Sequence, residues 1–93
     1  MCKSEVEKAV SAEIQKRGGW ETRLKSPLRR GVPDRVCCLP GIGAFFIEFK
    51  SYDDALAPAR SKRLREIIES GGRVFLVRSI EDFLWFLEKL EGD

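Results

Sequence analysis

The chain has 93 residues, of which 43% are hydrophobic and 34% charged, and its formal net charge is +2. This size and composition predict one globular domain over residues 1–93. No apolar run approaches the ~18 residues of a membrane-spanning helix, and the N-terminus does not resemble a secretory signal. We therefore expect an intracellular, reducing location and no membrane partner. The absence of histidine excludes the usual general base and the commonest zinc ligand.

The three cysteines do not suggest a disulfide framework, because their number is odd and Cys37 and Cys38 are adjacent. Adjacent strand residues point to opposite faces, so these two are expected to be small strand residues rather than joint zinc ligands. Basic residues outnumber acidic ones up to Ser79, whereas acidic residues dominate after it. Such an asymmetry is typical of a surface that binds a polyanion.

The first predicted element is a helix over residues 4–17. Ser4 and Glu7 have the spacing of a capping box at its start, and two glycines follow its end. Its apolar side chains recur on one face, which we expect to point to the core: Val6, Val10 and Ile14.

The remaining elements are predicted from the period of their apolar residues and from the turn residues between them. They are strands over 20–25, 35–39, 44–50 and 73–78, and helices over 58–70 and 80–90. The Pro-Gly turn over 40–43 predicts a hairpin, and the strand–helix–strand run from 44 to 78 predicts a parallel pair with a right-handed crossover. The order α-β-β-β-α-β-α predicts an α/β fold, a small mixed sheet flanked by helices.

The candidate catalytic residues are Asp34, Glu48 and Lys50. Strand alternation puts Glu48 and Lys50 on one face of their strand, whereas the other face carries core residues: Phe45, Ile47 and Phe49. Asp34 precedes the strand that pairs with this one, so the hairpin brings it beside Glu48 or Lys50. Two carboxylates this close need a cation between them, and Mg²⁺ with its waters fits such a pair. The pattern favours phosphodiester hydrolysis, with a plain cross-strand ion pair as the alternative.

Two further charged residues fall on helix faces that are otherwise apolar. Glu7 shares a face with Val10 and Ile14, so it is either a third metal ligand or only a capping-box glutamate. Arg60 lies four residues before Leu64, in the stripe that continues with Ile67 and Ile68. A charge there either extends along the surface to water or points into a polar site.

The remaining candidates lie on surfaces. Possible contacts to phosphate groups are the basic residues of the loop and of the helix over 58–70: Arg29, Arg30, Lys62, Arg63 and Arg65. On the last helix the predicted core stripe is Ile80, Phe83, Leu84, Leu87 and Leu90. Trp85 lies away from this stripe and Phe86 lies at its margin, which indicates a second buried surface such as a homodimer interface. A lone exposed aromatic residue is the alternative.

Several segments resemble the stand-alone VRR-NUC domains of the PD-(D/E)XK nuclease superfamily. The resemblance covers roughly residues 4–80, with SEVEKAV, KRGG, SPLRRGVPDR, FFIEFK, the L-x-P segment at 56–58, and ESGGRVFLVRS. It implies a restriction-endonuclease-like core. It also implies that Glu7, Asp34, Glu48 and the backbone carbonyl of Phe49 bind Mg²⁺ or Mn²⁺, and that Lys50 is catalytic.

The resemblance also implies a function. Similar stand-alone domains act as Holliday-junction resolvases or other structure-selective endonucleases, commonly as homodimers and often from phages. Branched DNA, such as a four-way junction, is therefore the expected substrate, and a bacterial or infected host cytoplasm the expected location. The family usually has Gln where this chain has Arg60, and an arginine there is expected to contact the scissile phosphate. The alternatives are a DNA-binding module with impaired catalysis and a small structural or assembly protein.

Overall fold

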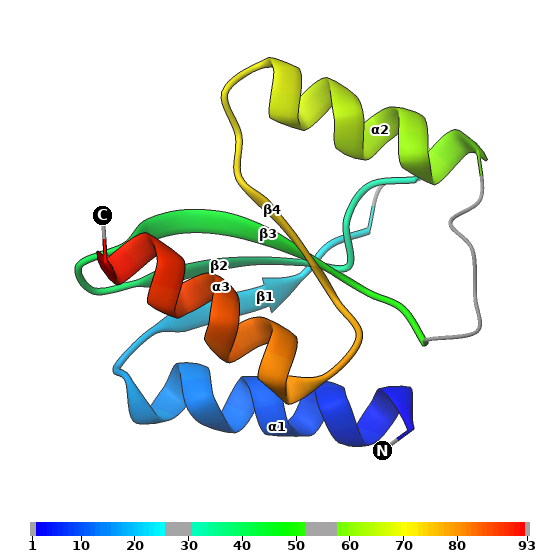
Figure 1. The fold of residues 1–93 in the computed structure, drawn as a ribbon. Helices are drawn as coiled ribbons and strands as arrows, with labels where there is room; N and C mark the ends of the chain where they lie inside the picture. The colour runs from blue at the N-terminus through cyan, green and yellow to red at the C-terminus, as the bar shows by residue number, and fades with distance from the viewer. Residues whose placement is uncertain (1, 26–30, 52–57, 93) are drawn as a thin grey trace.

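The computed structural model describes residues 2–25, 31–51 and 58–92 of the chain (Figure 1). Its elements in chain order are α1 (Lys3–Lys16), β1 (Trp20–Arg23), β2 (Arg35–Leu39), β3 (Gly43–Phe49), α2 (Pro58–Glu69), β4 (Val74–Val77) and α3 (Ile80–Gly92). The predicted α/β order is confirmed. The bounds differ from the predicted ones by one or two residues at most, as at the end of β1.

The described residues form one mixed sheet with the strand order β1-β2-β3-β4. The first three strands pair antiparallel, and β3 pairs parallel with β4, so the predicted hairpin and the predicted parallel pair are both confirmed. In the hairpin, Arg35 lies opposite Ile47. Continuing this register by one residue brings Asp34 beside Glu48, on one of the two central strands.

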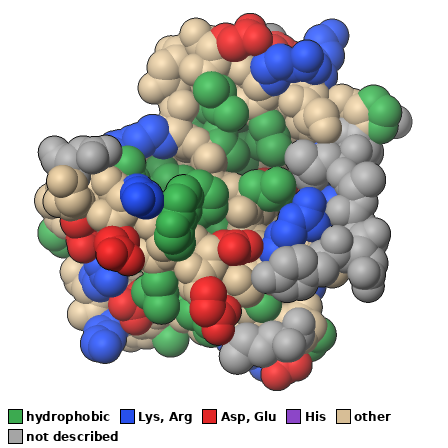
Figure 2. All heavy atoms as spheres, in the orientation of Figure 1, with side chains coloured by type: hydrophobic (Ala, Val, Ile, Leu, Met, Phe, Trp, Pro, Cys, Tyr) green, Lys and Arg blue, Asp and Glu red, His purple; other side chains and the backbone are tan. Residues whose placement is uncertain are grey.

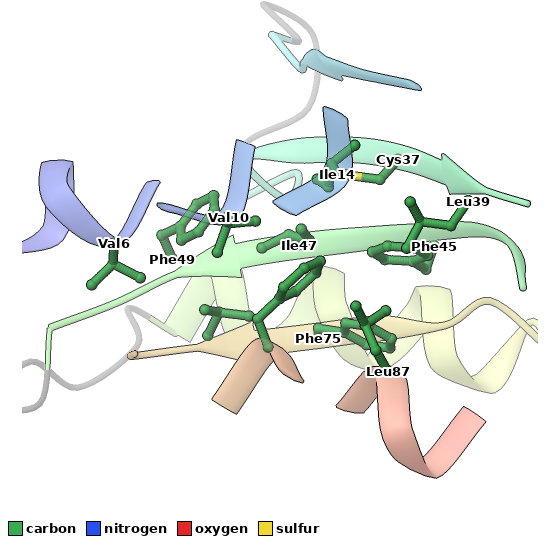
Figure 3. Close-up of a cluster of buried hydrophobic side chains, with 12 residues drawn as sticks. Val6, Val10, Ile14, Cys37, Leu39, Phe45, Ile47, Phe49, Phe75 and Leu87 are labelled. Carbon is green, nitrogen blue, oxygen red and sulfur yellow. The ribbon is translucent and has the colours of Figure 1, made fainter. Parts of the chain in front are cut away.

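The hydrophobic core lies on the face of the sheet that α1 and α3 cover (Figures 1 and 3). Phe45, Ile47 and Phe49 of β3 are each at most 1% exposed there, as strand alternation predicts. Phe45 stacks on Phe75 of β4, with ring centroids 4.5 Å apart. Helix α1 adds its predicted stripe: Val6, Val10 and Ile14. Each fully buried side chain contributes about 1.5–3 kcal/mol, so β3 is held firmly from this side.

Helix α2 lies on the opposite face of the sheet (Figure 1). Its Leu64 is buried, but Ile68 is 55% exposed, so the prediction that Ile68 belongs to the buried stripe is wrong. The reason is that α2 contacts the edge strand β4 and leaves part of this face of the sheet uncovered. Apolar side chains consequently gather at the surface over α2 and the sheet (Figure 2).

The start of α1 differs from the prediction in a way that matters for the site. The helix begins at Lys3, so Cys2 is its N-cap, and the Cys2 N–H donates to Glu5 Oε1 at 3.3 Å. The predicted capping box of Ser4 and Glu7 is therefore wrong, because the helix begins earlier and Cys2 and Glu5 form the box instead. Glu7 lies in the second turn of the helix, where its carboxylate is available for other contacts.

Helix α3 follows its predicted pattern with one exception. Phe83 and Leu87 are buried, but Leu84 is 39% exposed, so its place in the core stripe is wrong. It lies one step beyond the part of α3 that faces β4 and α1. Trp85 is 54% exposed, as predicted. Phe86 is half-buried and stacks on Phe75 at 4.7 Å, so much of its ring is already covered by this chain.

The cysteines lie as strand alternation predicts. Cys37 and Cys38 are both free thiols, the first buried against the core and the second exposed on the other face. Burial raises the pKa of the Cys37 thiol to about 12, so this side chain behaves as an apolar core residue. None of the helices that the structure describes combines the length and apolar character needed to cross a bilayer.

Candidate active site

Asp34 is held in place at the mouth of the β2–β3 hairpin. Its Oδ2 atom accepts a hydrogen bond from the backbone N–H of Phe49 at 2.8 Å. Its backbone carbonyl accepts another from the Leu24 N–H at 2.9 Å, which continues the β1–β2 pairing past Arg23. Pro33 precedes it and is buried, and its ring fixes the φ angle of the chain just before Asp34. Hydrogen bonds to its backbone carbonyl and to its side chain thus hold Asp34 in place.

Glu48 occupies the centre of the sheet on the face away from the core. Only 1% of the residue is exposed, although it carries a carboxylate. Burial raises the pKa of Glu48 above its ordinary value, the hydrogen bond from Arg60 acts in the opposite direction, and the nearby charge of Asp34 raises it further. A buried carboxylate next to a second one requires a positive partner.

That partner is Arg60, in the first turn of α2. Its Nη1 atom lies 2.8 and 2.7 Å from the Glu48 Oε1 and Oε2 atoms and 3.3 Å from Asp34 Oδ1. The side chain therefore points into a polar site, which confirms one of the two readings of a charge in the apolar stripe. The hydrogen bond to Glu48 is the main cause that raises the pKa of Arg60.

Lys50 follows directly after β3. Its backbone N–H donates to the carbonyl of Val77 at 3.1 Å, so the parallel pairing with β4 continues past the last strand residue. The side chain is half-buried, and the alternation of β3 places it on the same side as Glu48. The predicted trio of Asp34, Glu48 and Lys50 is thus brought to one end of the hairpin by strand pairing.

A second charged cluster adjoins the first and is centred on Arg35, which sequence reasoning missed. Arg35 is 5% exposed, and its Nη1 lies 2.6 Å from both Ser11 Oγ and Glu21 Oε1. Its Nη2 lies 3.5 Å from Glu7 Oε1, and its guanidinium stacks over the Phe49 ring at 4.9 Å. The sequence did contain a signal: Arg35 lies on the same strand face as the core residues Cys37 and Leu39, so alternation along β2 predicts a buried charge.

Glu7 is therefore bound to Arg35 rather than joined to the carboxylate pair. Within the described parts of the chain, no three His, Cys, Asp or Glu side chains stand close enough together to hold one metal ion. Glu7 and Asp34 nevertheless line one surface cavity of about 210 Å³, together with Arg35. The remaining lining residues are Arg23, Leu24 and Lys25, so the rim of this cavity is basic. Sequence reasoning had not singled out Arg23 or Lys25.

The donor chemistry of the site fits a hard divalent cation. Asp34 and Glu48 offer carboxylate oxygens, and the residue between Glu48 and Lys50 adds a backbone carbonyl, which are the ligand types Mg²⁺ and Mn²⁺ prefer. The Nη1 atom of Arg60 already lies within hydrogen-bond distance of both carboxylates, so the arrangement accommodates positive charge between them. The site thus fits such an ion.

The predicted phosphate contacts have different outcomes. Arg29 and Arg30 lie outside the described residues. Lys62 and Arg65 are exposed on α2, as expected. Arg63 is half-buried rather than exposed, and its Nη1 lies 2.8 and 2.9 Å from the two carboxylate oxygens of Glu66.

Comparisons with known proteins agree with this fold. No protein-family model matches the sequence. A protein of Acyrthosiphon pisum secondary endosymbiont phage 1, described as "Putative nuclease p44", is 32% identical over 74 residues, which is 80% of each chain. A solved structure described as a VRR_NUC domain superposes with a TM-score of 0.83 over 92% of this chain and 94% of that one, at 25% identity. The chain belongs to the VRR-NUC family of nucleases, as its motifs had implied.

Proposed function

We propose that the chain is a Mg²⁺- or Mn²⁺-dependent endodeoxyribonuclease that acts as a single domain on branched DNA. The observation that carries the proposal is the meeting of Asp34 and Glu48 at one cationic nitrogen, at the end of the strand that continues into Lys50. Carboxylates that share a cation, with an ammonium group beside them, are the equipment of phosphodiester hydrolysis in a chain without histidine.

Each residue has a role that follows from its position. Asp34, Glu48 and the Phe49 carbonyl would hold the ion, and Glu7 would add a further ligand once it leaves Arg35. The bound ion supplies a Lewis acid that neutralises charge on the phosphate and promotes ionisation of water. The Lys50 ammonium orients the attacking water or stabilises the negative charge that develops on the phosphate oxygens.

The reaction that these roles support is in-line hydrolysis. The oxygen of water bonds to phosphorus and the water releases one proton, while the bond from phosphorus to the 3′ oxygen breaks. The departing 3′ oxygen takes up a proton, which leaves a 5′-phosphate and a 3′-hydroxyl. The basic rim formed by Arg23 and Lys25 lies beside Asp34 and is suited to hold the neighbouring phosphates of the same strand.

The branched substrate and the homodimer are the finer parts of the proposal. Two symmetric cuts across a four-way junction require two sites related by a two-fold axis, which a homodimer provides. Trp85, 54% exposed on α3, supports a further buried surface because an aromatic residue is costly to leave in water. Phe86 adds only the part of its ring that Phe75 leaves exposed to this surface.

A second candidate function is a DNA-binding module that does not cut. The observation that favours it is Arg60, whose guanidinium already neutralises both carboxylates of the site. In that case the basic rim still binds phosphates while hydrolysis is lost.

Cleavage of a labelled four-way junction and of its matching linear duplex, in Mg²⁺ and in Mn²⁺, separates the two. The proposal predicts paired cuts in the junction, loss of cutting with Lys50→Ala, and normal cutting with Lys16→Ala, an exposed lysine on α1. Binding of the junction without cutting in either metal would support the binding module instead.

A further inference from the structure

One nitrogen atom lies at the centre of the acidic site. Arg60 Nη1 lies within hydrogen-bond distance of three carboxylate oxygens, two of Glu48 and one of Asp34. This nitrogen carries only two hydrogens, so it cannot make three separate linear hydrogen bonds. Its position among the oxygens is that of a cation surrounded by anionic ligands, which is the position a bound metal ion would take.

The guanidinium stabilises the protein without metal. Glu48 is almost fully buried, and the nearby negative charge of Asp34 further disfavours its ionised form. An unpaired charge in such a place is strongly destabilising, because a buried charge without its partner is poorly solvated. Arg60 supplies the missing charge from α2, an element outside the strand hairpin that carries the carboxylates.

We propose, on the basis of the proposed function, that Arg60 acts as an internal counter-ion that excludes the metal ion, and that the two occupy the carboxylate site alternately. Both need the same oxygens of Glu48 and Asp34, and both are positively charged. A divalent ion placed among these oxygens with Nη1 still present would face a like charge at contact distance in a buried site. Metal loading therefore requires the guanidinium to leave.

Arg60 is placed so that it can leave. One third of its side chain is exposed, in contrast to 2% for the Glu48 side chain, so the guanidinium reaches solvent by rotation of its own torsions. Once displaced, it remains in the first turn of α2 beside the site, where a DNA phosphate is the anion available to replace the carboxylates. The exchange thus links metal loading to substrate binding.

The exchange lowers the apparent affinity for metal. If only a fraction of molecules has the carboxylates free, the apparent dissociation constant rises by the inverse of that fraction. Arg60→Gln removes the charge and keeps a polar side chain, so it should bind Mn²⁺ at least about tenfold more tightly than the unaltered protein. Arg60→Lys keeps the charge and should stay weak.

Calorimetric titration with Mn²⁺ tests this without any DNA. The variants are Arg60→Gln, Arg60→Lys and Arg65→Gln, the last a control that removes an exposed arginine from the same helix. Tighter binding by Arg60→Gln alone supports the proposal. Equal or weaker binding by Arg60→Gln overturns it. If Arg60→Gln and the unaltered protein bind Mn²⁺ equally and Asp34→Asn does not bind it, the exchange is wrong but the metal site of the proposed function stands. If no variant binds Mn²⁺, both proposals fail.

Thermal unfolding gives a second readout. Without metal, Arg60→Gln should melt at a lower temperature than the unaltered protein, because Glu48 and Asp34 lose their counter-ion. At the same Mn²⁺ concentration its melting temperature should rise by more than that of the unaltered protein, since the stabilisation by a ligand grows with the logarithm of its concentration divided by Kd. An equal rise in both proteins contradicts the exchange.

Discussion

The Asp34 carboxylate accepts a hydrogen bond from the backbone N–H of Phe49 at 2.8 Å. This bond ties the residue that opens β2 to the strand that carries Glu48, so the distance between the two carboxylates is set by the sheet rather than by flexible side chains. The same bond aligns the backbone between Glu48 and Lys50. Precise placement of this kind is what a catalytic site requires of its scaffold.

Replacing Asp34 by Asn separates the role of its charge from that of its hydrogen bond. An amide oxygen still accepts from the Phe49 N–H, so the fold should remain, whereas the ligand charge is lost. Junction cleavage should fall by about 10²–10³-fold, the effect typical of removing one electrostatic element of a site. Single-turnover kinetics measure the rate, and circular dichroism checks the fold. Unchanged cleavage would exclude Asp34 as a ligand.

Lys50→Ala should reduce cleavage and spare DNA binding. In the proposed mechanism the ammonium acts on the attacking water or the developing charge, whereas the phosphates are assigned to the basic rim near Arg23 and Lys25. Binding is measured by fluorescence anisotropy in Ca²⁺, and cleavage in Mn²⁺. Arg23→Gln is the matched variant and should show the reverse pattern, with weaker binding at every salt concentration. If Lys50→Ala weakens binding as much as Arg23→Gln does, Lys50 is a phosphate contact only.

Glu48 should make the stability of the metal-free protein depend on pH. Its pKa is raised in the folded protein above the ordinary value of 4.5, mainly by burial, so the folded state holds the proton more tightly than the unfolded state. Its contribution to stability is therefore greatest below pH 4.5 and declines as the pH rises through the folded pKa. Denaturant unfolding from pH 4 to 7 should show this decline, and Glu48→Gln should show less of it. Identical profiles would contradict the raised pKa.

Arg35→Gln should destabilise the fold, because Arg35 is buried among Glu7, Glu21 and Ser11. The loss of one partner from a buried ionic cluster costs about 3 kcal/mol in the free energy of unfolding. Arg17→Gln is the control, since Arg17 forms two ion pairs and about one third of its side chain is exposed. That change should cost less than about 1 kcal/mol. Equal losses would show that Arg35 is not held more strongly than a surface arginine.

Trp85→Ala should convert the proposed homodimer into a monomer. The indole is 54% exposed, and a buried aromatic anchor commonly supplies much of an interface energy. Light scattering after gel filtration measures the mass of each form. Trp20→Ala is the matched control, because Trp20 is equally exposed but lies on the edge strand β1. A monomer from Trp20→Ala and a dimer from Trp85→Ala would move the interface to that strand.

The sequence predicted those features that depend on local signals. The glycine pairs after α1 and α2 end those helices, and the alternation in β3 separates Phe49 from Glu48 and Lys50 correctly. The turn before β3 implied the hairpin, and the hairpin implied that Asp34 lies beside Glu48 or Lys50; the register places it beside Glu48. The charge of Arg60 in an apolar stripe left two alternatives, and the structure shows that it points into the polar site.

Features that depend on how far one element covers another could not be read from the sequence. Leu84 and Ile68 fit the apolar stripes of their helices, yet each lies past the edge of the contact and is exposed. Arg35 is buried because α1 and β1 supply its partners from elsewhere in the chain. The capping frame of α1 is two residues earlier than predicted, with Cys2 and Glu5 in place of Ser4 and Glu7.

The most direct test of the site is single-turnover cleavage of a labelled four-way junction by the unaltered protein and by Glu48→Gln, each in Mn²⁺ and in EDTA. Glu48→Gln keeps the size of the side chain and removes the charge that holds a divalent ion. We expect 5′-phosphate products from the unaltered protein in Mn²⁺ alone, and none from the variant. Cleavage by Glu48→Gln at the unaltered rate, or cleavage that persists in EDTA, would contradict a metal-dependent nuclease centred on Asp34 and Glu48.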